Sequence, residues 1–359
     1  MKNRLFLDVH AIQTLPPSNI NRDDTGSPKT AQYGGIRRAR VSSQSWKRAI
    51  REYFYENSAQ ENVGIRSLNV VEYVADKIMK LDSSIGREEA LKMADKIFND
   101  AKVKTKDYKA KALFFLGESQ ANKLAEAAIE GVSNKDTIQE IFKSNPAIDI
   151  ALFGRMVADD PYLNEDASCQ VAHSISTHGI QTEFDFFTAV DDLAPEDNAG
   201  AGMLGTVEFN SSTMYRYANV AVHELLRQLE SKEATINTLK TFVEAFANSL
   251  PTGKVNTFAN QTLPQFIMVN LRIDRPVSLV SAFEEPVKSS EGFVDKSIEK
   301  LVQETERVEK FVEKPICTIV LNTRDMELNE EFINSDNMRN LLNKLGEELE
   351  VNIDESQGE

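Results

Sequence analysis

The sequence predicts an α+β fold of the ferredoxin-like type, with a four-stranded antiparallel sheet and two helices on one face. Strand patterns begin near the N-terminus and return after residue 146. Between them, residues 65–144 show helical spacing without interruption, which indicates a helical insertion. With that insertion set aside, the order is strand, helix, strand, strand, helix, strand. RNA-binding RRM domains share this order with many enzymes and regulators, and their usual glycine–aromatic strand pattern is absent here, so the order assigns no function.

The first elements surround a long loop. Arg4–Thr14 predicts a strand with apolar side chains on both faces, hence a central strand. Leu15–Gly35, with three prolines and three glycines, predicts a loop, and Ile36–Val41 predicts a short strand. Ser42 and Ser43 are N-cap candidates for a helix that runs to about Asn57. Helical periodicity puts the apolar side chains Trp46, Ile50, Tyr53 and Phe54 on one arc and the cations Lys47, Arg48 and Arg51 on the adjoining arc.

The second half of the chain returns to strands. Strands are predicted over 147–158, 170–178, 183–193, 206–222, 265–271 and 317–321. Helices are predicted over 235–250 and 297–314. The segment from Met326 onward predicts an acidic, partly disordered tail.

Composition indicates a water-soluble globular protein. The chain has 359 residues, of which 41% are hydrophobic and 27% charged, enough for a sizeable core. No apolar run approaches the roughly 18 residues of a membrane span, and the N-terminus lacks the pattern of a signal peptide. Two distant cysteines form no disulfide framework, and the four histidines show no metal-binding spacing. We therefore expect a cytoplasmic protein without a metal or cofactor.

Charge is distributed unevenly along the chain. Residues 1–51 hold ten Lys or Arg against three Asp, a balance of +7, within a chain of net charge −15. The remaining residues carry 31 basic and 53 acidic side chains, a balance of −22. A basic island on an acidic protein indicates one surface that binds a polyanion.

The basic island has the chemistry of a phosphate-binding surface. Gly34 and Gly35 permit close backbone approach, and arginines at 37, 38 and 40 lie on both faces of the short strand. The helix that follows offers unpaired N–H groups at its start and three cations along one face. Consecutive phosphates of a nucleic-acid backbone suit this arrangement. The alternative is a solvated basic face with a satisfied N-cap, and the strongly acidic remainder of the chain favours binding. The glycine motifs of nucleotide-binding loops are absent.

Two other features have competing interpretations. Asp23 and Asp24 could hold Mg²⁺ for phosphodiester cleavage, but without a third convergent carboxylate they are more typical of turn chemistry. Phe186 and Phe187 alternate in a predicted strand and could stack on bases of a projecting hairpin. Spacing alone favours a core position for both, and for Met156 as a gap-filling side chain.

Several long strings together resemble one family: the CasC family, the RNA-binding backbone subunit of the type I-E CRISPR surveillance complex, Cascade. The strings are "NRDD", "GGIRRARVSSQSWKRAIR", "DIALFGRM", "AHSISTH", "FDFFTAVDDL", "LGTVEFNSSTMYRYANV" and "MVNL". They cover the first 55 residues and most of 147–285, in the order of the family. The helical block and the tail match only in general character.

The resemblance implies an RRM-like palm (1–57 and 146–325), a helical fingers insertion (58–145) and a β-hairpin thumb (about 180–210). The acidic tail predicted from composition (326–359) follows the palm. It implies that copies assemble head-to-tail along CRISPR RNA, with other Cascade subunits, and that each thumb displaces one guide base. The other bases stay open to pair with target DNA. The family pattern itself places guide contacts at Arg22, Ser42, Gln44, Lys47 and Arg51, Met156 as a wedge, and Phe186 and Phe187 on the thumb. Together with the basic island, the predicted RNA-binding set is Arg22, Arg37, Arg38, Arg40, Ser42, Ser43, Gln44, Lys47, Arg48, Arg51, Met156, Phe186 and Phe187.

The resemblance also implies that the subunit is not an enzyme, because backbone subunits of this family are scaffolds that recruit a separate nuclease. The runner-up is Mg²⁺-dependent RNA cleavage by Asp23 and Asp24, because a related backbone subunit cleaves RNA through an aspartate in a comparable loop. A third alternative is an oligomeric protein that binds another anionic partner. One departure concerns Phe186, where the family can carry Trp; phenylalanine keeps the apolar wedge and loses the indole N–H.

Overall fold

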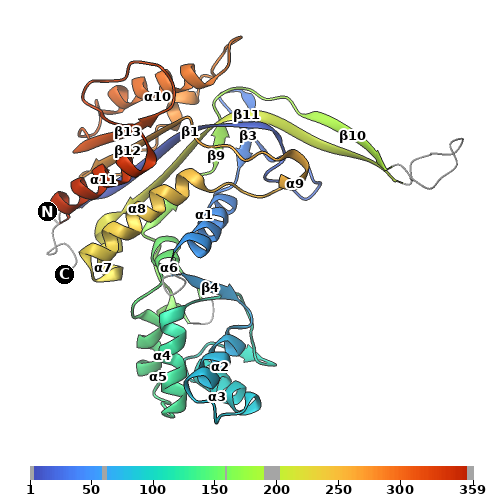
Figure 1. The fold of residues 1–359 in the computed structure, drawn as a ribbon, viewed down its shortest axis with the longest axis vertical. Coiled ribbons are helices and arrows are strands. Elements are labelled where there is room, and N and C mark those ends of the chain that lie inside the picture. Colours follow the sequence, from blue (N-terminus) through green and yellow to red (C-terminus); the bar gives the residue numbers. More distant parts are fainter. Residues whose placement is uncertain (1–3, 59–62, 158–159, 190–202, 354–359) are drawn as a thin grey trace, which may run out of the picture.

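A large mixed sheet forms the body of the protein (Figure 1). The computed structural model describes residues 4–58, 63–157, 160–189 and 203–353. Ten strands belong to the sheet, and its main path runs β14-β13-β12-β1-β11-β9-β3-β2, with β8 and β10 also paired to β11. The central strands are β1 (Phe6–Ser18), β11 (Met203–Ala221) and β12 (Phe266–Arg272). The remaining strands of the sheet are β2 (Thr30–Tyr33), β3 (Ile36–Val41), β8 (Cys169–Val171), β9 (Ser174–Ser176), β10 (Glu183–Ala189), β13 (Cys317–Asn322) and β14 (Ile333–Ser335).

Strand β1 occupies the centre, as its two apolar faces predict. It pairs antiparallel with β11 and β12, so that Val9 lies opposite both Ala218 and Val269. Leu7 and Val9 are completely buried. When a strand has neighbouring strands on both sides and both of its faces are covered, its sequence is a nearly continuous apolar run.

Helices α1 (Ser43–Asn57), α8 (Lys232–Asn248) and α11 (Met338–Asn352) cover one face of the sheet (Figure 1). Their buried side chains include Phe54, Phe242 and Leu345, each with no exposed area. Burial of one such side chain contributes about 1.5–3 kcal/mol relative to exposure. The shorter helices α7 (Val222–Leu229) and α9 (Val255–Phe258) connect these elements.

The opposite face is covered as well. The η4 turn (Val280–Phe283) and α10 (Val294–Val308) pack on it, with Phe283 and Ile298 buried against Tyr215. An RRM binds RNA bases by stacking them on the exposed face of its sheet. With both faces covered, this sheet leaves its edges, loops and attached elements as the surfaces for a ligand.

The insertion has its own core, built on α2 (Val70–Leu81), α3 (Arg87–Asp100), α4 (Glu118–Ile129) and α5 (Lys135–Lys143). The prediction of uninterrupted helix over 65–144 is wrong at two ribbons: β4 (Gly64–Ser67) with β7 (Phe114–Gly117), and β5 (Thr105–Lys106) with β6 (Lys109–Ala110). Apolar runs of four residues are too short for periodicity to separate a strand from a helix.

Two further predictions need correction. Residues 147–158 are not a strand, because Ile148–Phe153 form helix α6, which Gly154 ends at φ 77°. A 3-10 turn, η2 (Pro161–Leu163), follows it. The segment after Met326 is ordered as far as residue 353: β14 extends the sheet parallel to β13, and α11 buries Leu341, Leu345 and Leu349. Those leucines recur every four residues, the spacing of one helix face, which the acidity of the segment obscured. Residues 354–359 of the predicted tail lie outside the described residues.

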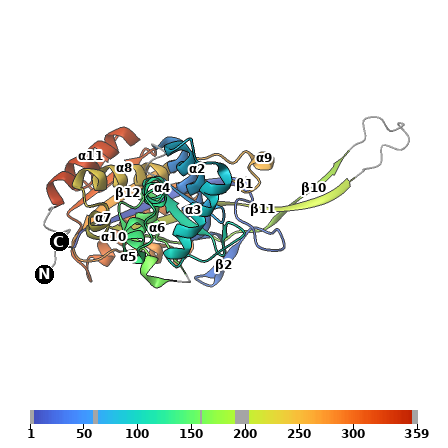
Figure 2. The same ribbon diagram turned by 90° about the horizontal axis from the view of Figure 1, so that it is seen from below.

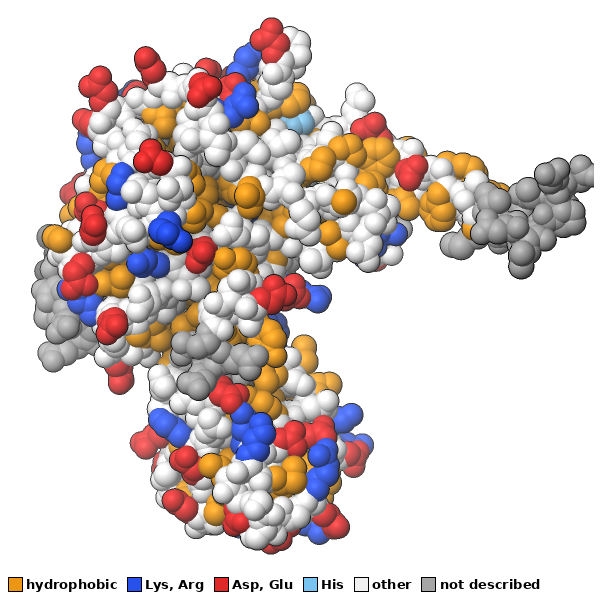
Figure 3. All heavy atoms as spheres, in the orientation of Figure 1, with side chains coloured by type: hydrophobic (Ala, Val, Ile, Leu, Met, Phe, Trp, Pro, Cys, Tyr) orange, Lys and Arg blue, Asp and Glu red, His pale blue; other side chains and the backbone are white. Residues whose placement is uncertain are grey.

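An arm projects from the body (Figure 2). It consists of β10 paired antiparallel with the first part of β11, from Glu183 opposite Phe209 to Ala189 opposite Met203. Every residue of β10 is exposed, and hydrophobic side chains lie along the arm (Figure 3). The hairpin predicted at about 180–210 corresponds to this arm, although its residues 190–202 lie outside the described part. Among the residues described, no helix has the length and apolar character needed to cross a membrane.

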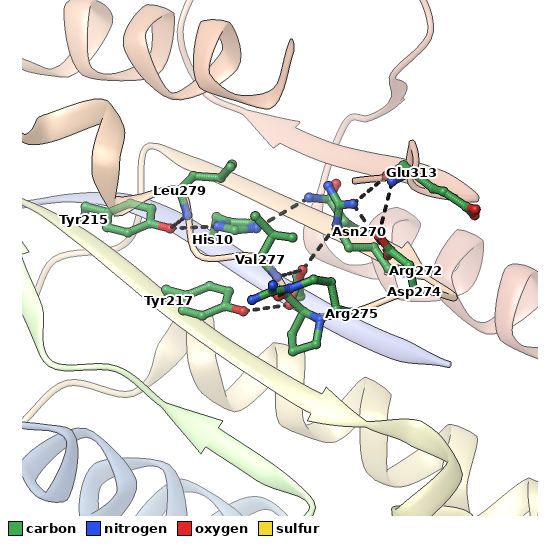
Figure 4. Close-up of polar contacts among 12 residues, drawn as sticks. His10, Tyr215, Tyr217, Asn270, Arg272, Asp274, Arg275, Val277, Leu279 and Glu313 are labelled. Atoms are coloured by element: carbon green, nitrogen blue, oxygen red, sulfur yellow. Dashed lines mark hydrogen bonds and ion pairs between the residues drawn. The ribbon is translucent and has the colours of Figure 1, made fainter. Parts of the chain in front are cut away.

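A polar network is buried between the sheet and the 277–308 cover (Figure 4). The Asp8 carboxylate accepts hydrogen bonds from the Tyr217 hydroxyl (2.8 Å) and the Val277 N–H (2.9 Å), and Arg272 Nε lies 3.4 Å away. Burial raises the pKa of Asp8 to about 7, against the opposing effect of these partners. The Tyr215 hydroxyl, which bonds to His10 Nδ1, accepts the Leu279 N–H. The network therefore fixes the cover to the sheet.

Candidate nucleic-acid interface

Helix α1 is held in place by its first turn and by its buried face. The Ser45 N–H donates to the Ser42 hydroxyl, so Ser42 is the N-cap. Trp46 Nε1 donates to the Ser174 hydroxyl at 2.8 Å, and the Arg216 guanidinium lies 3.7 Å from the Trp46 ring centroid. Trp46, Ile50 and Phe54 are buried, as the sequence predicts. The cationic side of the helix must therefore face outward.

That outward side lines a groove of about 520 Å³, called here the α1 groove. The opposite wall comes from β4, from the segment leading into β7, and from the loop after α6. Met156 lies in this lining and is 85% exposed. The lining residues are Gln44, Lys47, Arg48, Arg51, Arg66, Leu113, Phe115, Phe153, Gly154, Arg155, Met156, Asn164, Glu165, Asp166 and Ala167. Four of the predicted RNA contacts and Met156 thus meet in one place.

Lys47 and Arg48 are the cations of α1 that remain available to an anion. The Lys47 ammonium lies 5.5 Å from the Phe153 ring centroid, and it forms no ion pair within the described residues. Arg48 pairs with Glu52 at 2.8 Å, and its side chain is 79% exposed. An exposed pair of this kind contributes about 0–1 kcal/mol, so a phosphate can replace it at little cost.

Arg51 differs because it is already engaged. Its Nε donates to Asp149 Oδ2 at 3.1 Å, and its guanidinium lies 4.4 Å from the Phe115 ring centroid. Asp149 is completely buried and also accepts the Gly64 N–H at 2.8 Å. Desolvation raises the pKa of Asp149, while Arg51 and Gly64 act in the opposite direction. Arg51 therefore joins the body to the insertion at one edge of the groove.

The backbone at Gly154 and the inward-facing Arg155 side chain leave Met156 exposed. Gly154 adopts a left-handed conformation, and a Cβ there would lie 2.8 Å from the Glu165 carbonyl oxygen. Arg155 turns inward and donates to the carbonyls of Leu163 (2.9 Å) and Phe142 (2.8 Å). Burial lowers the pKa of Arg155 to about 10. The core position expected for Met156 from composition is wrong.

Arg38 is a correction to the predicted interface. It is completely buried, and its guanidinium donates to the carbonyl oxygens of Tyr33, Ser176 and Phe283 at 3.2, 3.0 and 2.8 Å. Because its donors are committed to the backbone, Arg38 joins β3 to β9 and the cover and is not accessible to RNA.

The other predicted residues of the basic island lie outside the α1 groove. Arg37 is exposed on β3, and Arg40 donates to the Thr30 carbonyl at 3.1 Å and contacts His173. Ser43 lies in the first turn of α1. Arg22 lines a separate polar cavity of about 460 Å³ together with Ser45, Arg48 and Lys254. The structure therefore divides the island between several surfaces.

The aspartate pair shows turn chemistry. Asp23 Oδ1 accepts hydrogen bonds from the Thr25 N–H (2.9 Å), the Thr25 hydroxyl (2.7 Å) and the Ser27 N–H (3.0 Å). The hydrogen bond from the Thr25 hydroxyl is the largest contribution to the lowered pKa of Asp23. The part of the chain that the structure describes contains no group of three or more His, Cys, Asp or Glu that could hold a metal ion.

The aromatic residues of the arm are exposed. Phe186 is 65% and Phe187 38% exposed, so the core position expected from spacing is wrong for both. The Phe187 ring covers Gly205, where a Cβ would lie 2.3 Å from a ring atom. Phe184 is 65% exposed and shares the strand face of Phe186, two residues away. Phe184 is not among the RNA contacts predicted from the sequence, although its alternate spacing with Phe186 is visible there.

A cavity of about 530 Å³ also lies between the end of α1, α8 and the loop before α6. Among the described residues, its lining includes the carboxylates of Glu233 and Glu244 and no Lys or Arg. A negatively charged backbone would be repelled there, so the α1 groove is the better candidate interface.

Comparison with known proteins gives consistent results. The model of the family described as CT1975-like protein matches residues 7–347. A chain of a solved structure titled "CRISPR RNA-guided surveillance complex, pre-nicking" is 31% identical, with a TM-score of 0.83, covering 96% of this chain and 100% of that chain. A chain from another "CRISPR RNA-guided surveillance complex" is 28% identical, with a TM-score of 0.66 and coverage of 96% and 99%. No curated protein gives a significant match.

Proposed function

Because the chain belongs to the CT1975-like family, we propose that it is a non-catalytic backbone subunit of a Cascade complex that binds CRISPR RNA. Its similarity over nearly its whole length to a chain of a CRISPR RNA-guided surveillance complex supports this proposal. The family resemblance inferred from the sequence is thereby confirmed, and the role in guide binding is the step proposed here.

The α1 groove is the observation that carries the proposal. Lys47 and Arg48 both line the groove and offer positive charge to the phosphates of an RNA strand. Met156 projects an apolar side chain into the same groove, where it can contact a base or separate two bases. Cations beside an exposed apolar wedge fit single-stranded nucleic acid better than an isolated anion.

We propose a palm, fingers and a thumb on the basis of the strand order and of two attached elements. Strands β12, β1, β11 and β8 are neighbours in that order, with α1 after β1 and α8 after β11. This order supports the ferredoxin-like, RRM-like palm. We propose that the insertion with its own core is the fingers and that the arm is the thumb. Because bases cannot reach the covered sheet, the guide follows α1 instead.

The thumb supports assembly of several copies. Phe184 and Phe186 expose apolar rings on an arm that projects from the body. Exposed apolar surface of this kind is stabilised by burial against a partner. We propose that the arm reaches the guide on the next copy, in a head-to-tail series that presents the remaining bases to target DNA and contacts other Cascade subunits. The free cysteines Cys169 and Cys317 fit a reducing cytoplasm.

A gel experiment tests the proposal. Purified protein is incubated with end-labelled CRISPR-like RNA and Mg²⁺, and each sample is run on native and denaturing gels. We expect a ladder of slow-migrating species with intact RNA. RNA shortened by the wild type but not by an Asp23→Ala/Asp24→Ala variant would instead identify a nuclease.

A further inference from the structure

The second wall of the α1 groove is built by the ribbon of β4 and β7, which belongs to the insertion. Arg66 lies on β4 opposite Phe115 on β7, and Leu113 immediately precedes β7. Both side chains line the groove, and Leu113 is 53% exposed. Neither residue is among the RNA contacts predicted from the sequence.

Arg66 is exposed and has no ion pair or hydrogen bond with any other residue that the structure describes. The other insertion arginine, Arg87, pairs with Glu72 and Asp76. An arginine that lines a groove without a carboxylate partner keeps all five donors available for a ligand. Its guanidinium fits the geometry of a phosphate.

The ribbon is fixed relative to α1 by the Arg51 contacts. Arg51 reaches from α1 to Phe115 on β7, and Asp149 holds both Arg51 and the Gly64 N–H at the start of β4. Arg66 is two residues from Gly64, so its backbone is positioned by the same tie. The two cationic walls therefore form a preorganised site, which reduces the entropy lost on binding.

We propose that Arg66 and Leu113 complete the RNA site: Arg66 binds a backbone phosphate of the strand that lies along α1, and Leu113 packs against a nucleoside of the same strand. This inference rests on the proposed function and adds the insertion as a second RNA-contacting wall. Glu165 and Asp166 also line the groove, and their carboxylates repel phosphate. The strand therefore follows the cations of α1 and of the β4–β7 ribbon.

The test measures the affinity of the full chain for fluorescently labelled single-stranded RNA by anisotropy, over a range of salt concentrations. For Arg66→Ala we expect about tenfold weaker binding, the loss of one charge-assisted contact. The slope of log K against log salt should become less steep by about 0.7, the value for one phosphate contact on a single strand. Leu113→Ala should weaken binding while leaving that slope unchanged.

Lys96→Ala is the matched control, because Lys96 is an exposed cation of α3 that does not line the groove. Equal affinity and slope for Arg66→Ala and Lys96→Ala would overturn the inference. If Lys47→Glu still abolished binding in that case, the proposed function would stand. If neither Arg66→Ala nor Lys47→Glu changed binding, both would fail. Circular dichroism of each variant establishes that it is folded.

Discussion

The contact between Arg51 and Asp149 leads to a prediction that separates structure from RNA binding. Asp149 has no exposed area, and the Arg51 side chain is 24% exposed. Removing one member of a buried ion pair costs about 3–5 kcal/mol, because the other charge is left unpaired. Here Asp149 keeps the Gly64 N–H bond, and solvent reaches the edge of the site. We therefore expect Arg51→Ala to destabilise the fold by about 3 kcal/mol, at the lower end of that range.

The effect should depend on pH. Burial already raises the pKa of Asp149, and loss of Arg51 raises that pKa further. A carboxyl whose folded pKa lies above its unfolded value contributes stability at low pH and loses it as the pH rises. Lowering the pH therefore increases the unfolding free energy of Arg51→Ala more than that of the wild type. The difference in unfolding free energy should thus be largest near pH 7 and decrease towards pH 5.

The only tryptophan of the chain provides the assay, because Trp46 is buried in α1, five residues before Arg51. Urea unfolding followed by Trp46 fluorescence gives the free energy, and Arg48→Ala is the control on the same helix. We expect the control to change stability by less than about 1 kcal/mol, the range of an exposed pair. Equal stability of Arg51→Ala and the control would refute the structural role and return Arg51 to the RNA-binding set.

Four other predictions follow from individual contacts. Lys47→Glu should weaken RNA binding at least about tenfold with an unchanged unfolding curve, because Lys47 has no ion-pair partner among the described residues. Anisotropy measures the binding, and urea unfolding measures the stability. Arg38→Ala should cost about 2–4 kcal/mol, because buried carbonyl oxygens lose their donors; a melt indistinguishable from the wild type would contradict its structural role. Phe186→Ala/Phe187→Ala should reduce assembly on RNA in native gels with little change in melting temperature; a large drop in melting temperature alone would contradict this. The pKa of Asp8, raised from 3.8 to about 7, predicts that the wild type loses stability relative to Asp8→Asn as the pH rises from 4 to 8; a pH-independent difference between the two would exclude it.

The long periodic elements were predictable, and the short ones were not. β1 and α1 are each longer than ten residues, so their hydrophobic spacing is clear. The spacing predicts the central position of β1 and the buried face of α1. The run Phe114–Gly117 and helix α6 are four and six residues long, and periodicity cannot assign elements of that length. The tail was misjudged because its charge outweighed the leucine spacing of α11.

The site divides in the same way. The cations of α1 were predictable because three of them recur on one helix face. The contacts that each cation makes were not predictable. Arg51 pairs with Asp149, about 100 residues later in the chain, and no local sequence pattern indicates that pair. The burial of Arg38 was not predictable for the same reason. Arg38 donates to the carbonyl of Phe283, and the sequence of its short strand does not indicate that this distant segment covers one of its faces. Arg66 was overlooked because the wall it belongs to forms only when the insertion folds against α1.

The basic island is therefore divided between structural contacts and charge that lines the α1 groove. Part of its positive charge is engaged in contacts within the protein. Arg38 joins the sheet to its cover, and Arg51 joins α1 to the insertion through Asp149. The remaining part includes Lys47 and Arg48, which line the α1 groove and which we propose bind RNA. A charge-reversal of Lys47 together with Arg51 would place a second carboxylate beside buried Asp149, and lost binding could then reflect an altered fold. For this reason Lys47→Glu alone is the sharper test of RNA binding, and the structural arginines explain why the groove has a fixed shape before any RNA enters it.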